Sequence, residues 1–152
     1  MWFKSLNPYP QPPTMNQKVL IVDDEESILK GIKLNLGRSL DISVAHGPEQ
    51  ALDEVNESGP FAVVVSDMRM PGMDGASLMR QIKKENPETS CILLTGHADF
   101  EFGGSEALQS GQLFKILNKP CHPSALKNAI LSALDAQLQE VSGEEHAPDM
   151  IA

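Results

Sequence analysis

The sequence predicts an α/β fold in which five parallel strands form one doubly wound sheet with five helices on its two faces. Short apolar segments alternate strictly with segments of helical periodicity along the chain. The apolar segments are nearly continuous, which is typical of strands that are buried on both faces of a parallel sheet. In open sheets of this kind, ligand sites form beyond the carboxyl ends of the strands.

The expected strands are short runs rich in β-branched residues and leucine, at 19–22, 42–44, 61–66, 91–94 and 113–117. A helix is expected after each strand. Apolar residues at helical spacing mark four of these helices: Ile28, Ile32 and Leu36; Ala51 and Val55; Leu78 and Ile82; Leu126, Ile130, Leu134 and Leu138. The remaining helix, at 101–110, is weakened by Gly103 and Gly104 by about 1 kcal/mol per glycine relative to alanine.

Three regions are expected along the chain. Residues 1–16 contain four prolines between positions 8 and 13, so they should form an extended or disordered leader. Residues 17–139 should form the folded domain. Residues 140–152 are acidic and lack lysine and arginine, which indicates an acidic tail or the start of a linker.

The composition argues against several functions. The net charge is −9, whereas nucleic-acid binding needs a positive surface. The apolar runs are too short to cross a bilayer, and the N-terminus lacks the apolar stretch of a signal peptide. Cys91 and Cys121 lack a CxxC spacing and fit a reducing compartment. We therefore expect a cytoplasmic protein that binds neither nucleic acid, through this segment, nor membrane.

Polar residues follow four of the five expected strands at the carboxyl end. They are Asp23 and Asp24, Asp67, Thr95 and Lys119. Carboxylates in close quarters raise one another's pKa, and a hard cation such as Mg²⁺ relieves the repulsion. A carboxylate can also act as a nucleophile toward phosphorus, with a lysine and a hydroxyl group stabilising the transferred charge. One Asp alone is better explained as a helix cap, but the joint pattern indicates phosphoryl chemistry.

Four segments that carry these residues are similar to the receiver domain of bacterial response regulators. The segments are Val19–Glu25, Asp67–Gly75, Leu93–Gly96 and Asn118–Pro120. The resemblance covers about residues 18–138 and implies a flavodoxin-like, chemotaxis-regulator-like fold with strand order 2-1-3-4-5. It also implies a phosphoprotein of a two-component phosphorelay in signal transduction. The segment 111–120 further resembles receivers attached to cyclic-di-nucleotide phosphodiesterase domains.

The resemblance assigns a role to each site residue. Asp67 would be the phosphoacceptor. Asp24 and Asp67 would bind Mg²⁺ directly, the backbone carbonyl of Arg69 would be a third protein ligand, and Asp23 would act through water. Thr95 and Lys119 would contact the phosphoryl group, and the bond from Lys119 to Pro120 would be cis.

The resemblance also implies partners. These are a histidine kinase or phosphotransfer protein, a downstream protein partner or missing output domain, and a second copy in a homodimer through the face of the fourth and fifth helices. Catalysis would be limited to self-phosphorylation from phosphodonors and slow autodephosphorylation. One departure is Ile116, which occupies the position of the family's usual aromatic switch; Phe114 lies two residues earlier.

Two alternatives remain open at this point. A haloacid-dehalogenase-like phosphohydrolase uses similar groups, but its Asp-x-Asp motif follows the first strand, and Asp67-Met68-Arg69 lacks the second acid. A receiver-shaped module that binds partners without phosphorylation would be favoured by loss of the aspartate or the lysine, and both are present.

Overall fold

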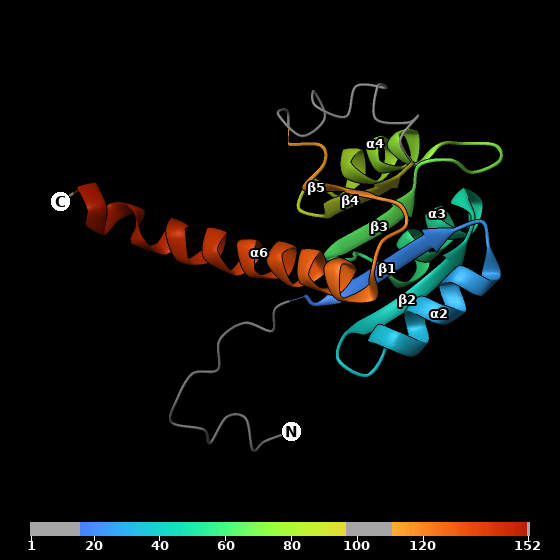
Figure 1. Ribbon diagram of the computed structural model, residues 1–152. Helices are drawn as coiled ribbons and strands as arrows, with labels where there is room; N and C mark the ends of the chain where they lie inside the picture. The colour runs from blue at the N-terminus through green and yellow to red at the C-terminus, as the bar shows by residue number, and fades with distance from the viewer. Residues whose placement is uncertain (1–15, 97–110, 152) are drawn as a thin grey trace, which may run out of the picture.

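The computed structural model describes residues 16–96 and 111–151, and within them one sheet of five parallel strands has the order β2-β1-β3-β4-β5 (Figure 1). The strands are β1 (Lys18–Asp23), β2 (Asp41–His46), β3 (Val63–Asp67), β4 (Ser90–Thr95) and β5 (Lys115–Asn118). The helices are α2 (Glu26–Leu36), α3 (Pro48–Ser58), α4 (Gly75–Glu85) and α6 (Pro123–Ile151). The predicted fold class and strand order are confirmed.

Both faces of the sheet are covered, and alternate residues of β1 show how. Val19 and Ile21 pack in one core cluster with residues of α2 and α6, whereas Leu20 and Val22 pack in a second cluster with residues of α3 and α4. This alternation follows from the strand geometry, in which successive side chains point to opposite faces. All four residues are at most 1% exposed, which explains the continuous apolar run in the sequence.

Two strands begin later than the apolar runs predict. Phe61 and Leu113 are buried, yet the strands that follow them begin at Val63 and Lys115. The register explains the first case, because Val63 pairs with Val19 near the start of β1. The expected helix at 101–110 lies outside the described residues, so four helices are found in the part of the chain that the structure describes.

Two helix starts hold the loops at the carboxyl edge of the sheet. The carboxylate of Asp74 accepts a hydrogen bond of 2.7 Å from the backbone N–H of Ser77 and so caps α4. Helix α3 begins with Pro48, where the missing N–H costs nothing, after Gly47 in a left-handed conformation with φ of 98°. Both loops are therefore fixed by their own sequence.

Helix α6 extends well beyond the sheet, as Figure 1 shows. The side chain of Gln137 fixes α6 near the end of the part of this helix that packs on the sheet. Its Nε2 atom donates hydrogen bonds to the carbonyl of Ala62 at 2.8 Å and the carbonyl of Glu88 at 3.1 Å, at the amino ends of β3 and β4. These bonds tie α6 to the edge of the sheet opposite the polar residues.

Candidate functional site

Three carboxylates meet at the carboxyl edge of the sheet. Asp23 ends β1, Asp24 follows it, and Asp67 ends β3. Each offers an oxygen atom within 4.8 Å of the others. Because β1 and β3 are neighbouring parallel strands in which Val22 pairs with Ser66, they deliver Asp23 and Asp67 side by side. Asp23 is 1% exposed and Asp67 is 7% exposed.

Lys119 lies beside this cluster. Its Nζ atom is 2.9 Å from Oδ1 of Asp67, and its backbone N–H donates to the carbonyl of Thr95 at 2.8 Å. Burial lowers the pKa of the Lys119 ammonium, but the hydrogen bond and the charge of Asp67 outweigh burial, so the pKa is raised overall. Lys119 therefore stays a cation at the mouth of the acidic cluster. The peptide bond between Lys119 and Pro120 is cis, as the family resemblance implies.

Two buried oxygen atoms of the edge have no hydrogen-bond partner among the described residues. They are Oδ2 of Asp23 and Oγ1 of Thr95. A buried polar atom without a partner costs free energy, and a bound ion or water would satisfy it. Hard carboxylate oxygens, one of them unsatisfied, are the donors that Mg²⁺ prefers, so this cluster fits the predicted metal.

The carboxyl group of Asp23 has a raised pKa. Burial is the largest cause, the N–H of Glu25 at 2.9 Å from Oδ1 opposes it, and the charge of Asp67 adds to it. The folded protein thus holds this proton more tightly than the unfolded chain does. The protonated carboxyl group of Asp23 therefore contributes stability at low pH. This contribution is lost as the pH rises from the pKa of the unfolded chain through the higher pKa of the folded protein.

The variant Asp23→Asn should consequently increase the free energy of unfolding of the metal-free protein at pH 7, because the amide carries no buried charge. The gain should be smaller at pH 4, because a lower pH favours the protonated, uncharged form of the wild-type carboxyl group. Urea unfolding in EDTA at the two pH values measures this difference. Asp53→Asn, on the exposed side of α3, is the control. A variant no more stable than wild type at pH 7 would contradict the prediction.

The loop after Asp67 is fixed by close backbone packing. The N–H of Met68 donates to the carbonyl of Leu94 at 2.9 Å, and the N–H of Gly75 donates to the carbonyl of Met68 at 2.8 Å. A Cβ atom on Gly75 would lie 2.4 Å from the carbonyl oxygen of Asp67 and 2.8 Å from Cδ1 of Leu93. Only glycine fits here. The sequence marks this loop through its turn residues but does not reveal the close approach.

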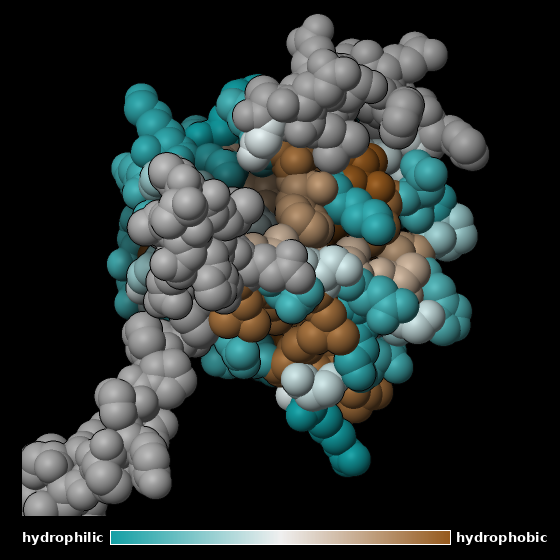
Figure 2. Space-filling model, turned by 90° about the vertical axis from the view of Figure 1, so that its left-hand side faces the viewer, coloured by the Kyte–Doolittle hydropathy of each residue, from teal (hydrophilic) through white to brown (hydrophobic). Residues whose placement is uncertain are grey.

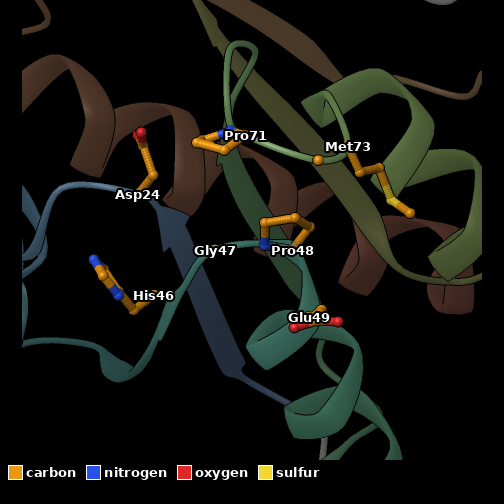
Figure 3. A pocket seen from close by; sticks show the side chains of 8 residues that line it. Asp24, His46, Gly47, Pro48, Glu49, Pro71 and Met73 are labelled. Carbon is orange, nitrogen blue, oxygen red and sulfur yellow. The ribbon is translucent and has the colours of Figure 1, made fainter.

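Two cavities adjoin the carboxylate cluster on different sides. The first, of about 620 Å³, is shown in Figure 3 and lies between the loop 46–49, the loop 71–73 and Asp24. The second, of about 480 Å³, is a groove between α2 and the segment after β5. We call it the α2 groove; it is lined by Asp23, Ile28, Ile32, Leu36, Leu94, Lys119, Pro120, Cys121, Pro123 and Leu126. The sequence indicated neither cavity.

The predicted residues outside the cluster have different surroundings. The side chain of Arg69 is exposed in the loop two residues after Asp67. Ile116, at the position of the aromatic switch, is half-buried and packs against the core cluster of α3 and α4. Phe114, just before β5, is 38% exposed. In this chain the aromatic ring of Phe114 therefore does not occupy the position of the aromatic switch, which is held by Ile116.

The strand order and the acidic carboxyl edge together define the class of protein as a flavodoxin-like fold of the receiver type. A family model described as the response regulator receiver domain matches residues 19–131. The chain therefore belongs to the response regulator receiver family of two-component systems, whose members are phosphoacceptor domains. The phosphohydrolase and the non-phosphorylated module are not favoured.

Individual relatives agree with this family. The response regulator protein PilR of Pseudomonas aeruginosa is 32% identical over 134 residues, which are 88% of this chain and 29% of PilR. A receiver domain structure from Clostridium thermocellum is 33% identical with a TM-score of 0.74, covering 80% of this chain and 97% of that one. A structure of an adenylate cyclase from Rhodopirellula baltica is 34% identical with a TM-score of 0.80. The match covers 88% of this chain and 98% of that one.

The chain spans only part of its longer relatives, 29% of PilR and 34% of the transcriptional regulatory protein YesN of Bacillus subtilis. Receiver domains bind Mg²⁺ at an acidic pocket and interact with histidine kinases and output domains. They are in general phosphoacceptors rather than catalysts of substrate turnover. A search of the described helices finds none long and apolar enough to cross a membrane.

Proposed function

We propose that Asp67 accepts a phosphoryl group from a histidine kinase or phosphotransfer protein and that its phosphorylation switches partner binding. The observation that carries this proposal is the contact between Lys119 and Asp67 at 2.9 Å, inside a cluster of three carboxylates. An acid paired with a fixed cation, on the same edge as a buried hydroxyl group that has no partner among the described residues, is arranged to receive an anion.

The metal would be held by the carboxylates of Asp23, Asp24 and Asp67 and the backbone carbonyl of Arg69. When bound, Mg²⁺ neutralises charge on the phosphoryl oxygens and orients them. The unpartnered Oδ2 of Asp23 supports this ligand set, because a metal-bound water would satisfy it.

The chain's own groups would act as follows. A carboxylate oxygen of Asp67 attacks phosphorus, an O–P bond forms, and the P–N bond of the phosphohistidine breaks with its electron pair on nitrogen. The Lys119 ammonium donates a hydrogen bond to a phosphoryl oxygen in exchange for its contact with Asp67. The hydroxyl group of Thr95, which finds no hydrogen-bond partner among the residues that the structure describes, donates another and moves toward the phosphoryl group.

The direct test is to map the phosphorylated residue. The protein is incubated with phosphoramidate and Mg²⁺, the acyl phosphate is reduced with borohydride, and the peptides are analysed by mass spectrometry. Conversion of position 67 to homoserine is expected, and EDTA should prevent it. Modification at another residue, or none, would refute the assignment.

Catalysis is limited to the chain's own phosphorylation and slow dephosphorylation, and the domain comprises residues 17–139. A downstream protein or an output domain receives the signal. The protein acts in the cytoplasm, where kinases have ATP and where Cys91 and Cys121, both unpaired, would stay reduced.

We also propose a homodimer through the face formed by the fourth and fifth helices of the expected fold. The fifth of these helices is α6, and the fourth, expected at 101–110, lies outside the described residues. Figure 2 shows apolar side chains gathered on the face of the molecule that lies at the left of Figure 1. Leu131 and Leu138 of α6 are 42% and 41% exposed, so this helix offers apolar side chains to a second copy. Equal sedimentation with and without beryllofluoride would count against a phosphorylation-driven dimer.

We further propose that the phosphodonor protein docks in the α2 groove. The groove is lined mainly by apolar side chains, and Asp23 and Lys119 of the acidic cluster line it too. A partner that buries an apolar helix there is held directly beside Asp67, so docking and phosphoryl transfer share one surface.

Ile32→Asp should therefore slow phosphotransfer from the cognate kinase by roughly tenfold or more, because it places a charge in an apolar contact. Labelling by phosphoramidate should be unchanged, since a small donor needs no docking surface. Leu34→Asp is the matched control: Leu34 lies on the same helix, is 83% exposed and does not line the groove. Stopped-flow or phosphor-imaging assays give both rates. Equal loss with both donors, or with both variants, would rule out this docking surface.

A further inference from the structure

The cavity of Figure 3 adjoins the acidic cluster because Asp24 belongs to both. Its walls are the loops 46–49 and 71–73, which come from opposite sides of β1. The N–H of Gly47 donates to the carbonyl of Asp23 at 3.0 Å, so the first loop is fixed to the strand that carries the cluster. A molecule in this cavity of about 620 Å³ would therefore lie next to the phosphoryl site.

The lining combines apolar surface with hydrogen-bond acceptors. Pro48, Pro71 and Met73 supply carbon and sulfur atoms, and Asp24 and Glu49 supply carboxylates. The imidazole of His46 also lines the cavity, and neither lysine nor arginine is among the described residues that line it. Glu49 lies in the first turn of α3 and is exposed, whereas Asp24 is half-buried. In Figure 3, Asp24 and Pro71 lie on one side of the cavity, and Pro48 and Glu49 on the other. Because Asp24 would hold the metal, the free carboxylate of this wall is that of Glu49, which attracts a group with N–H bonds and positive charge and repels an anion.

The geometry points to a leaving-group subsite: we propose that this cavity receives the non-phosphoryl part of small phosphodonors and favours amidophosphates over acyl phosphates. The inference rests on the proposed function of Asp67. In phosphoramidate the nitrogen carries an extra proton at neutral pH, so the departing group begins as an ammonium. In acetyl phosphate the departing group leaves as a carboxylate, which Glu49 repels.

The step is balanced for phosphoramidate. A carboxylate oxygen of Asp67 forms the O–P bond, the P–N bond breaks, and its electron pair returns to the nitrogen, which departs as neutral ammonia. The total charge of −2 is unchanged, because the carboxylate and the singly anionic donor become a doubly anionic acyl phosphate. Charge on the nitrogen is thus lost during the reaction, so Glu49 acts by attracting and positioning the donor.

Glu49→Gln removes this charge at nearly constant shape. Because Glu49 is exposed, its attraction is screened by water, and the ratio of phosphoramidate to acetyl phosphate labelling rates should fall by roughly two- to fivefold. Asp53→Asn is the matched control, because Asp53 is an exposed acid on the same helix and does not line the cavity. Its ratio should equal that of wild type. The fall should shrink in 0.5 M salt.

An equilibrium measurement separates binding from reaction. Aminomethylphosphonate is a stable zwitterion with the shape of ethylphosphonate, which lacks the ammonium. With Mg²⁺ present, it should bind wild type more tightly than ethylphosphonate does, with shifts of the Gly47 and Gly72 amide resonances, and Glu49→Gln should reduce this preference.

The outcomes are distinguishable. A wild type that neither donor labels refutes the proposed function and this inference together. A wild type that both donors label, with the same rate ratio and the same phosphonate preference in Glu49→Gln, refutes the leaving-group subsite and leaves the function of Asp67 intact. A lower ratio in Glu49→Gln but not in Asp53→Asn supports it.

Discussion

Exchanging Asp67 for asparagine is expected to lower Mg²⁺-dependent labelling by phosphoramidate by a factor of roughly 10³ or more, because an amide oxygen is a poor nucleophile toward phosphorus. The variant should stay folded, since asparagine has the same shape and the buried strand residues around it are unchanged. Mass spectrometry of the intact protein measures the labelled fraction, and far-ultraviolet circular dichroism checks the fold.

A matched control for this exchange lies in the same loop. Asp74→Asn should label at the wild-type rate, because the Asp74 side chain caps α4 through the N–H of Ser77 and asparagine caps equally well. If Asp67→Asn labels as well as wild type, Asp67 is not the acceptor.

The variant Gly75→Ala should have the largest effect on stability. The added Cβ would lie 2.4 Å from the carbonyl oxygen of Asp67, and backbone atoms cannot yield as a flexible side chain does. We expect a loss of about 1–3 kcal/mol in the free energy of unfolding, as for other overpacked sites. The shift of Asp67 should also slow labelling by roughly 10²-fold, since positioning errors near 1 Å have costs of this size.

Gly31→Ala is the control for this second exchange. Gly31 lies inside α2, and a Cβ there meets nothing within 4 Å. Alanine should therefore increase stability by about 1 kcal/mol through its higher helix propensity. Urea unfolding of the two variants should thus give shifts of opposite sign. A Gly75→Ala protein as stable as wild type would show that the loop relaxes away from Asp67.

That Asp23, Asp24, Asp67 and Lys119 lie together could be predicted from the sequence, because these residues stand at strand ends. An apolar run that stops at an acid, as at Asp23 and Asp67, places that acid at the carboxyl edge whenever the sheet is parallel. Strand starts were less certain. Phe61 is as apolar and as buried as a strand residue, yet the hydrogen bonds to β1 begin one residue later, where the N–H of Ala62 donates to the carbonyl of Lys18.

Features formed by two distant segments were not predictable from the pattern. The need for glycine at position 75 arises from the carbonyl of Asp67 and the side chain of Leu93, which are eight and eighteen positions away in the sequence. The α2 groove likewise forms only when α2 lies beside the segment that follows β5. Periodicity shows which side of a helix faces the core, but it carries no information on where two elements leave space between them.

The placement of the two thiols has a practical consequence. Burial raises the pKa of Cys91 to about 12, so this thiol is almost wholly protonated at neutral pH and shielded from reagents. Burial also raises the pKa of the Cys121 thiol, but this side chain is only half-buried and lines the α2 groove beside Pro120. A thiol-directed fluorophore would therefore attach selectively at Cys121 in the unmodified protein. It would give an optical reporter of groove occupancy, with no engineered cysteine needed.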